Sequence, residues 1–310
     1  MTTEALARAM FTDLIDYAGL FPPAQRALPT AYDEYRRSLQ APHAWMLGRF
    51  IVPFSRFSEL VGVHGSSTSI AASVILDADR ESRLWLNEIS EQLATLAEGA
   101  RGAATVVPVA LEIPVPRLLA ARENYGAVLS QIGALLDRFG LRELPCYVEF
   151  PRDDRWEHEM PAAVESLARG RLRSKIRCGG LAAAAFPSAS EIAAHLRACA
   201  EYGVAWKATA GLHHPVAHRE VGTGFEMHGF VNLLVASCLA IQSAPFEEIE
   251  AVLAERSSAA FAFDGDGLSW RGRRCETTAI ERSRRNGLLS YGSCSVSEPL
   301  DDLVALGWLR

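Results

Sequence analysis

The chain has 310 residues, of which 49% are hydrophobic and 22% charged, and its formal net charge is −6. This composition is typical of a globular protein with a large core, and the acidic balance gives no support to nucleic-acid binding. The six cysteines form no CxxC pair, so neither a zinc module nor a disulfide framework is indicated. No basic segment precedes an apolar run at the N-terminus, and the longest apolar run, 230–241, is shorter than the ~20 residues that span a bilayer. We therefore expect a cytoplasmic protein that does not insert into membranes.

Apolar runs of strand length alternate with helical segments along the whole chain. The expected strands cover residues 14–19, 45–54, 69–76, 104–113, 145–150, 173–177, 204–210 and 259–263. Most are continuous apolar runs, as in parallel sheets covered by helices, and the spacing of about 35 residues is typical of βα repeats. Eight such units predict one (β/α)8 TIM barrel over residues 1–310, with 290–310 as an irregular C-terminal tail. The alternative, an open doubly wound sheet, is disfavoured because no GxGxxG follows the first strand.

Two of the expected strands carry a lysine that precedes a glycine turn. Lys207 stands in the run WKATAG that ends at Gly211, and Lys175 lies on the preceding strand. A lysine in an apolar frame either pairs with a carboxylate or loses its proton, and a second lysine nearby also favours the neutral amine. A neutral amine attacks a carbonyl carbon and forms a Schiff base, which withdraws electrons while a C–C bond breaks or forms.

The active site of a TIM barrel lies at the carboxyl ends of its strands, where further polar residues of this chain are expected. Asp16 and Glu149 are candidate proton carriers beside the two lysines. Candidate substrate-binding residues, able to hold an anionic group or contact the substrate, are Arg177, Arg49, Thr209, Gly179, Gly180, His213 and His214. The pattern therefore predicts a class I aldolase-type lyase that acts on a small anionic carbonyl compound with no cofactor and no metal. The oligomeric state stays open, a homo-oligomer included.

Three other interpretations fit the same residues. In the first, the barrel is a non-catalytic ligand-binding protein and the charged residues are a buried lattice of Lys175, Lys207, Glu112 and Glu149. In the second, the protein is a metal-dependent hydrolase or isomerase that uses His213, His214 and Glu149. In the third, Cys294 is a nucleophile, although a lone cysteine near a C-terminus is more often inert.

Three short stretches of the chain resemble the deoxyribose-phosphate aldolase group of class I aldolases. These are Asp16 after the first strand, Lys175 followed by Gly179, and the run 207–211 (KATAG). The resemblance implies a barrel in which Lys175 forms the Schiff base and Lys207 assists. The chain departs from the family where Arg177 and Cys178 replace small hydroxyl residues. The drier sequence around Lys207 favours that lysine instead, so the residues alone leave the nucleophile open.

Overall fold

The computed structural model describes residues 4–65, 68–99, 105–117, 125–152, 156–265 and 267–309. The strands of the main sheet are β1 (Ile15–Tyr17), β2 (Leu47–Pro53), β3 (Ile70–Ile75), β4 (Val106–Pro114), β5 (Cys146–Glu149), β6 (Arg173–Arg177), β7 (Trp206–Thr209) and β13 (Leu288–Ser293). The helices are α1 (Glu4–Phe11), α2 (Leu28–Ser38), α3 (Phe57–His64), α4 (Trp85–Gly99), α6 (Tyr125–Arg138), α7 (Trp156–Arg169), α8 (Ala189–Tyr202), α9 (Phe230–Ile241), α10 (Phe246–Leu253), α11 (Thr277–Asn286) and α12 (Ser297–Ala305).

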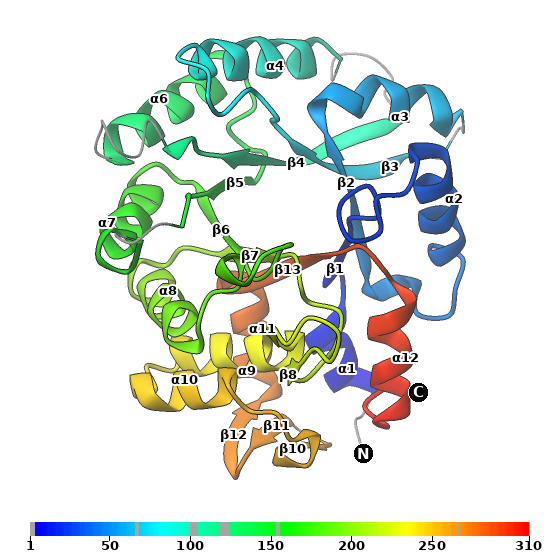
Figure 1. Ribbon diagram of the computed structural model, residues 1–310, viewed down its shortest axis with the longest axis vertical. Helices are drawn as coiled ribbons and strands as arrows, with labels where there is room; N and C mark the ends of the chain where they lie inside the picture. Colours follow the sequence, from blue (N-terminus) through cyan, green and yellow to red (C-terminus); the bar gives the residue numbers. More distant parts are fainter. Residues whose placement is uncertain are drawn as a thin grey trace.

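The main sheet is a closed parallel barrel with the strand order β1-β13-β7-β6-β5-β4-β3-β2. Figure 1 shows these strands as an inner ring with the helices around them. The chain is therefore a (β/α)8 barrel, and seven of the eight expected strands are barrel strands. Ala104, the first residue of the fourth expected strand, lies outside the described residues.

The eighth barrel strand is not the expected one. The segment 259–263 contributes to β10 (Phe261–Asp264), which pairs antiparallel with β11 (Gly267–Trp270). These two strands and β12 (Arg273–Glu276) form a separate small sheet. The residues of β10 are alternately buried and exposed, a pattern that fits an antiparallel sheet with one solvated face better than a barrel strand covered by helices. A second small sheet pairs β8 (His218–Arg219) with β9 (Glu226–Met227).

Residues 290–310, expected to be an irregular tail, instead complete the barrel and add a helix. β13 pairs in parallel with β7 on one side and with β1 on the other. Its sequence, LLSYGS, is poor in large apolar residues because Ser290 and Gly292 point into the barrel, where space is small. α12 then follows and leads away from the end of β13 on the outside of the barrel (Figure 1).

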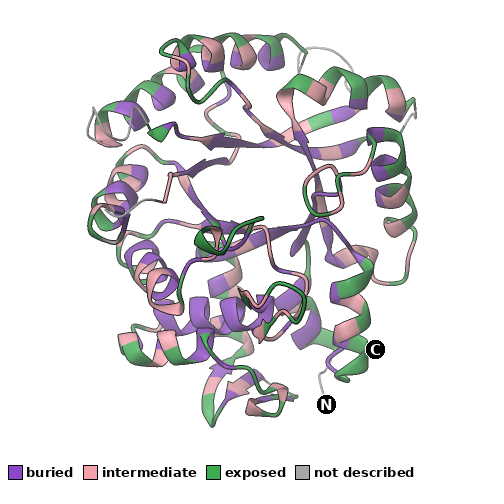
Figure 2. Ribbon diagram, in the orientation of Figure 1, coloured by how far each residue is buried: buried purple, intermediate pink, exposed green. Residues whose placement is uncertain are grey.

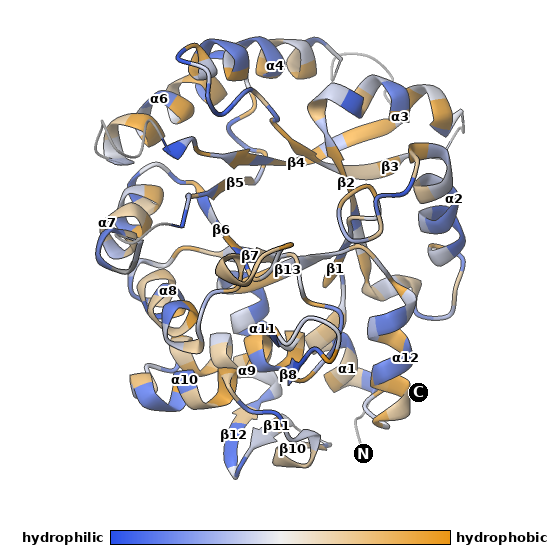
Figure 3. Ribbon diagram, viewed as in Figure 1, coloured by the Kyte–Doolittle hydropathy of each residue, from blue (hydrophilic) through white to orange (hydrophobic). Residues whose placement is uncertain are grey.

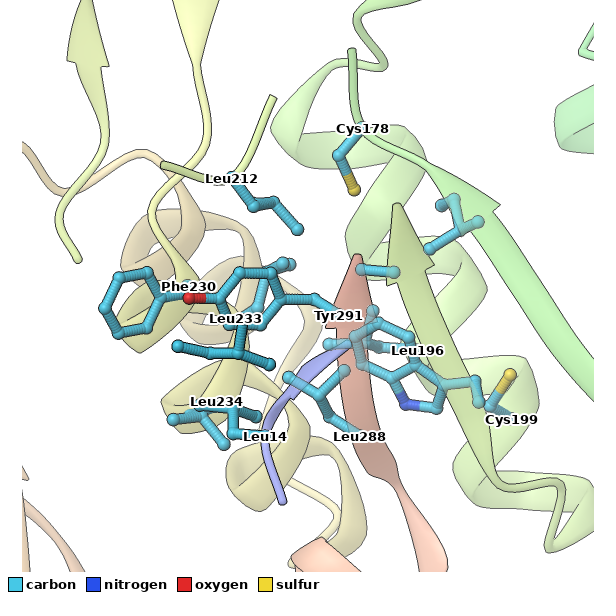
Figure 4. Packing of buried hydrophobic residues seen from close by; sticks show 14 of the residues in the cluster. Leu14, Cys178, Leu196, Cys199, Leu212, Phe230, Leu233, Leu234, Leu288 and Tyr291 are labelled. Atoms are coloured by element: carbon cyan, nitrogen blue, oxygen red, sulfur yellow. The ribbon is translucent and has the colours of Figure 1, made fainter. Parts of the chain in front are cut away.

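The core occupies the layer between the barrel and its helices. The strands are mostly buried, whereas the outer faces of the helices are exposed and hydrophilic (Figures 2 and 3). On the outer face of β13, Tyr291 stacks on Phe230 of α9 with ring centroids 5.2 Å apart, among the leucines of α8 and α9 (Figure 4). Burial of these side chains orients the strands so that the alternate residues face the barrel interior. Among the described helices, none is both long and apolar enough to cross a membrane.

Candidate active site

The strands place a row of charged side chains inside the barrel near its carboxyl end. Lys175 on β6 lies beside Lys207 on β7 in register, and Glu149 on β5 lies beside Lys175. Trp206 and Ala208, the neighbours of Lys207, are buried in the hydrophobic core. Strand alternation therefore directs the lysines inward, as the sequence predicts.

Carboxylates separate the cations in this row. Lys207 Nζ donates to Asp16 Oδ2 at 2.6 Å and to Glu112 Oε1 at 2.8 Å. Lys175 Nζ lies 2.7 Å from the other oxygen of Glu112, Oε2, and 2.9 Å from Glu149 Oε2. Glu112 thus bridges the two lysines, so each ammonium faces two carboxylates rather than the other ammonium.

Lys207 is a fully buried cation. Burial by itself would lower its pKa, but the charges of Asp16 and Glu112 outweigh burial and raise the pKa above its ordinary value. The ammonium also lies 5.4 Å from the ring centre of Tyr147. The expectation that the apolar frame and a second lysine would free this amine of its proton is therefore wrong, because Asp16 and Glu112 come from strands far away in the sequence.

Lys175 differs from Lys207 because it reaches open space. It is 6% exposed and lines a cavity of about 1210 Å³ at the barrel mouth, which Lys207 does not line. Oε2 of Glu112 receives no well-aligned hydrogen bond from the described residues, although Lys175 Nζ is within ion-pair distance. Lys175 is thus held by the charges of Glu112 and Glu149 while its side chain lines the cavity.

The three buried carboxylates are ionised. Burial would raise the pKa of Glu149, but Lys175 and Arg177 outweigh it and lower the pKa to about 2. Burial would also raise the pKa of Glu112, but Lys175 and Lys207 outweigh it and lower the pKa. At Asp16, Lys207 and Arg49 outweigh burial in the same way, and this pKa is lowered too. Asp16 is fully buried and also accepts a hydrogen bond from Ser290 Oγ at 2.8 Å. It holds Lys207 in place rather than facing the cavity.

The two expected anion-binding arginines have different surroundings. Arg177 lies with its Nε 3.1 Å from Glu149 Oε1, but half of its side chain is exposed and it lines the cavity. Arg49 instead turns inward, with Nη1 3.4 Å from Asp16 Oδ2. Arg26, which the sequence did not single out, also lines the cavity. Arg177 and Arg26 thus bring guanidinium groups to the cavity wall, although Arg26 Nε also lies 2.6 Å from Glu34 Oε2.

Glycines at two strand ends let the loops touch. The Cα atom of Gly211 would lie 3.0 Å from a Cβ added at Gly179, and Gly211 itself has φ +72°. A side chain at either position would push apart the loops that follow β6 and β7. Gly180 and Thr209, two further expected substrate contacts, line the cavity beside this crossing.

The adjacent histidines contact different carboxylates. His213 Nδ1 lies 2.9 Å from Glu298 Oε2, and His214 Nδ1 lies 2.6 Å from Asp302 Oδ2, both on α12. Glu149 is engaged by Lys175 and Arg177 instead. In the part of the chain that the structure describes, no group of three or more His, Cys, Asp or Glu residues is placed to hold a metal ion. His213, His214 and Glu149 are therefore not assembled as a set of metal ligands.

The chain contains very few lysines, and this scarcity draws attention to the two that it has. Of its 31 lysine and arginine residues, 29 are arginines and only Lys175 and Lys207 are lysines. Arginine serves the other cationic positions, and among the described residues the two lysines are buried whereas Arg284 is partly exposed. A primary amine is the property that arginine cannot supply.

No protein-family model matches the chain, and no curated protein is detectably similar to it. The site must therefore be interpreted from its own geometry.

Proposed function

We propose that the protein is a lyase of the class I aldolase type, in which Lys175 forms a Schiff base with a small anionic carbonyl compound. The observation that carries this proposal is that the chain keeps its only two lysines side by side on β6 and β7, with one of them lining the cavity. The TIM-barrel fold is compatible with such an enzyme, whose active site lies at this end of the strands.

The two carboxylates beside Lys175 suit the positively charged Schiff base that the proposal requires. Lys175 first gives a proton to Glu149, and the free amine attacks the carbonyl carbon. That proton and a second one from the attacking nitrogen pass to the carbonyl oxygen, which leaves as water, and a protonated imine remains. This iminium has the same charge as the ammonium that it replaces, so Glu112 and Glu149 stabilise it without rearrangement. Lys207, ion-paired with Glu112 and Asp16, keeps Glu112 ionised and positioned.

The bond-breaking step needs a base and an anion-binding group. The iminium accepts the electron pair of the breaking C–C bond and becomes an enamine, while the hydroxyl group on the carbon that leaves gives its proton to a base and becomes the carbonyl group of the released product. Glu149, whose Oε2 lies 2.9 Å from Lys175 Nζ, is the candidate base; it lines a second, smaller cavity of about 360 Å³, which Lys175 and Arg177 also line. Arg177 and Arg26 line the space in which the anionic group of the substrate would lie.

Borohydride trapping tests this proposal directly. The protein is incubated with pyruvate, dihydroxyacetone phosphate or acetaldehyde, reduced, and digested with a lysine-specific protease. Unmodified chain yields fragments 1–175, 176–207 and 208–310, because it has two lysines. A reduced adduct on Lys175 blocks cleavage there and yields a heavier fragment 1–207.

Arginine variants provide matched controls, because they keep the positive charge and remove the amine. Lys175→Arg should form no adduct, whereas Lys207→Arg should still form one at Lys175. An adduct on Lys207 would overturn the assignment of the nucleophile. Absence of any adduct in folded protein, with all three probes, would overturn the Schiff-base proposal and leave a ligand-binding barrel.

A further inference from the structure

A second group of reactive side chains lines the same cavity. Cys294 Sγ lies 3.6 Å from His213 Nε2, and His213 Nδ1 lies 2.9 Å from Glu298 Oε2. Cys294 follows the end of β13, His213 lies in the loop after β7, and Glu298 is in the first turn of α12. Figure 1 shows β7 and β13 side by side, with α12 leading away from the end of β13. The cavity of about 1210 Å³ is lined by all three residues.

The orientation of the imidazole distinguishes this group from a chance contact. One ring nitrogen faces a thiol and the other faces a carboxylate, which is the arrangement of a nucleophile, a base and an orienting group. Arg26 Nη1 also donates to the carbonyl oxygen of Cys294 at 3.2 Å and so fixes the backbone of the nucleophile. The other five cysteines are 0% to 3% exposed in the core, whereas Cys294 is 8% exposed at the cavity wall.

We propose that Cys294, His213 and Glu298 form a nucleophilic thiol site that accepts an acyl group from small activated esters or thioesters entering the barrel mouth. This site is independent of the Schiff-base proposal, because none of its three side chains contacts Lys175 or Lys207 in the described ion-pair network. Both sites open onto one cavity.

The reaction balances with water as the co-reactant. The thiolate of Cys294 attacks the acyl carbon, a C–S bond forms, and the bond from that carbon to the alkoxide or thiolate leaving group breaks. His213 gives its proton to the leaving group. Water then attacks the S-acyl carbon while His213 takes up a proton, which releases the carboxylic acid and restores the thiolate. The net reaction is hydrolysis of the ester.

The protonation state of His213 supports this cycle. Its hydrogen bond with Cys294 raises the pKa of the imidazole, Glu298 raises it further, and together they outweigh burial, so that the pKa is about 9. A protonated ring can give a proton to the leaving group. α12 begins three residues after Cys294, at Ser297.

The test uses p-nitrophenyl acetate as the acyl donor and the full-length protein. We expect a burst of p-nitrophenolate equal to one equivalent of protein, and the mass of one acetyl group on Cys294 by peptide mapping. Cys294→Ser should lose the burst, and His213→Asn should slow acetylation by about a hundredfold. No acetyl group on Cys294, or acetylation of His213→Asn at the wild-type rate, would overturn the proposal.

Glu298 is a positioning residue, so its test needs a measurement that a structural role would not change. Glu298→Gln should slow acetylation and lower the pH at which the His213 ring titrates, followed by NMR, because the carboxylate that raises this pKa is gone. Asp302→Asn, the matching change beside His214, should leave both values unchanged. An unchanged His213 titration in Glu298→Gln would overturn the assigned role of Glu298.

Crossed variants separate the two proposals. Lys175→Arg should retain acetylation of Cys294, and Cys294→Ser should retain any borohydride-trapped adduct on Lys175. Loss of both reactions in folded Lys175→Arg would mean that the thiol site is not independent, and would overturn that part of the proposal. Thermal unfolding of each variant confirms that the chain is folded.

Discussion

At the scale of single residues, the site depends on Glu112, which bridges two lysines through its two oxygens. Without it, the ammonium groups of neighbouring strands would face each other in a dry interior. The same carboxylate explains the opposite environments of the lysines. Lys207 is locked between Glu112 and Asp16, whereas Lys175 has one side toward the cavity.

Removal of the buried cation should cost much more stability than removal of an exposed one. Lys207→Met leaves Asp16 and Glu112 with one fewer cation in a dry site, and we expect unfolding free energy to fall by about 3 to 5 kcal/mol. Arg285→Ala, which breaks an exposed pair with Glu281, should cost less than about 1 kcal/mol. Urea unfolding measures both, and equal losses in the two variants would contradict a stabilising role for the network.

At the scale of elements, the loops after β6 and β7 meet at two glycines and so bring their polar residues to one side of the cavity. The carbonyl oxygen of Cys178 would lie 3.1 Å from a Cβ added at Gly211. Ala210, directly before it, already has φ +63°, so the backbone here is held in an uncommon conformation at the wall of the cavity.

Gly211→Ala should therefore lower the free energy of unfolding more than the same substitution at a glycine that has a similar φ but free space around it. Gly203 has φ +67°, at the end of α8, and no atom within 4 Å of an added Cβ. Both changes to alanine should cost about 1 to 2 kcal/mol for the left-handed conformation. Gly211→Ala should cost more because of the contact with Cys178. Equal losses in urea unfolding would show that the loop contact is not tight.

At the scale of the whole molecule, the segment after residue 287 closes the barrel. β13 fills the gap between β7 and β1, and without it both strands would expose an edge of unpaired backbone groups. α12 contributes less to closure, although its buried Leu303 and the adjacent Trp308 cover apolar surface near β10. The last residues of the chain are thus structural as well as part of the candidate site.

Two truncations test barrel closure. A chain that ends at residue 287 lacks β13 and should show no cooperative thermal transition, because the barrel is open. A chain that ends at residue 296 keeps β13 and should melt cooperatively at a lower temperature, since it loses only the packing of α12. Calorimetry distinguishes these outcomes, and a cooperative transition in the shorter chain would contradict the role of β13.

Local pattern was sufficient for most of the fold and for the direction of the two lysines. Apolar runs bounded by glycine, proline or aspartate marked seven barrel strands, and the two-residue period of a strand correctly directed Lys175 and Lys207 into the barrel. The same rules failed for β13, because its inward positions are filled by Ser290 and Gly292 and its composition does not resemble a buried strand.

The sequence by itself determined most of the barrel architecture and the placement of two inward-facing lysines near the strand ends, because both follow from periodicity and residue type. Tertiary structure alone decided that Lys207 stays protonated, that Lys175 faces the cavity, and that Cys294 meets His213. The physical reason is distance along the chain. Asp16 and Lys207 are 191 residues apart, and Cys294 and His213 are 81 apart. These pairs meet only when the barrel closes, so the effect of the Asp16 charge on Lys207 cannot be predicted from neighbouring residues in the sequence.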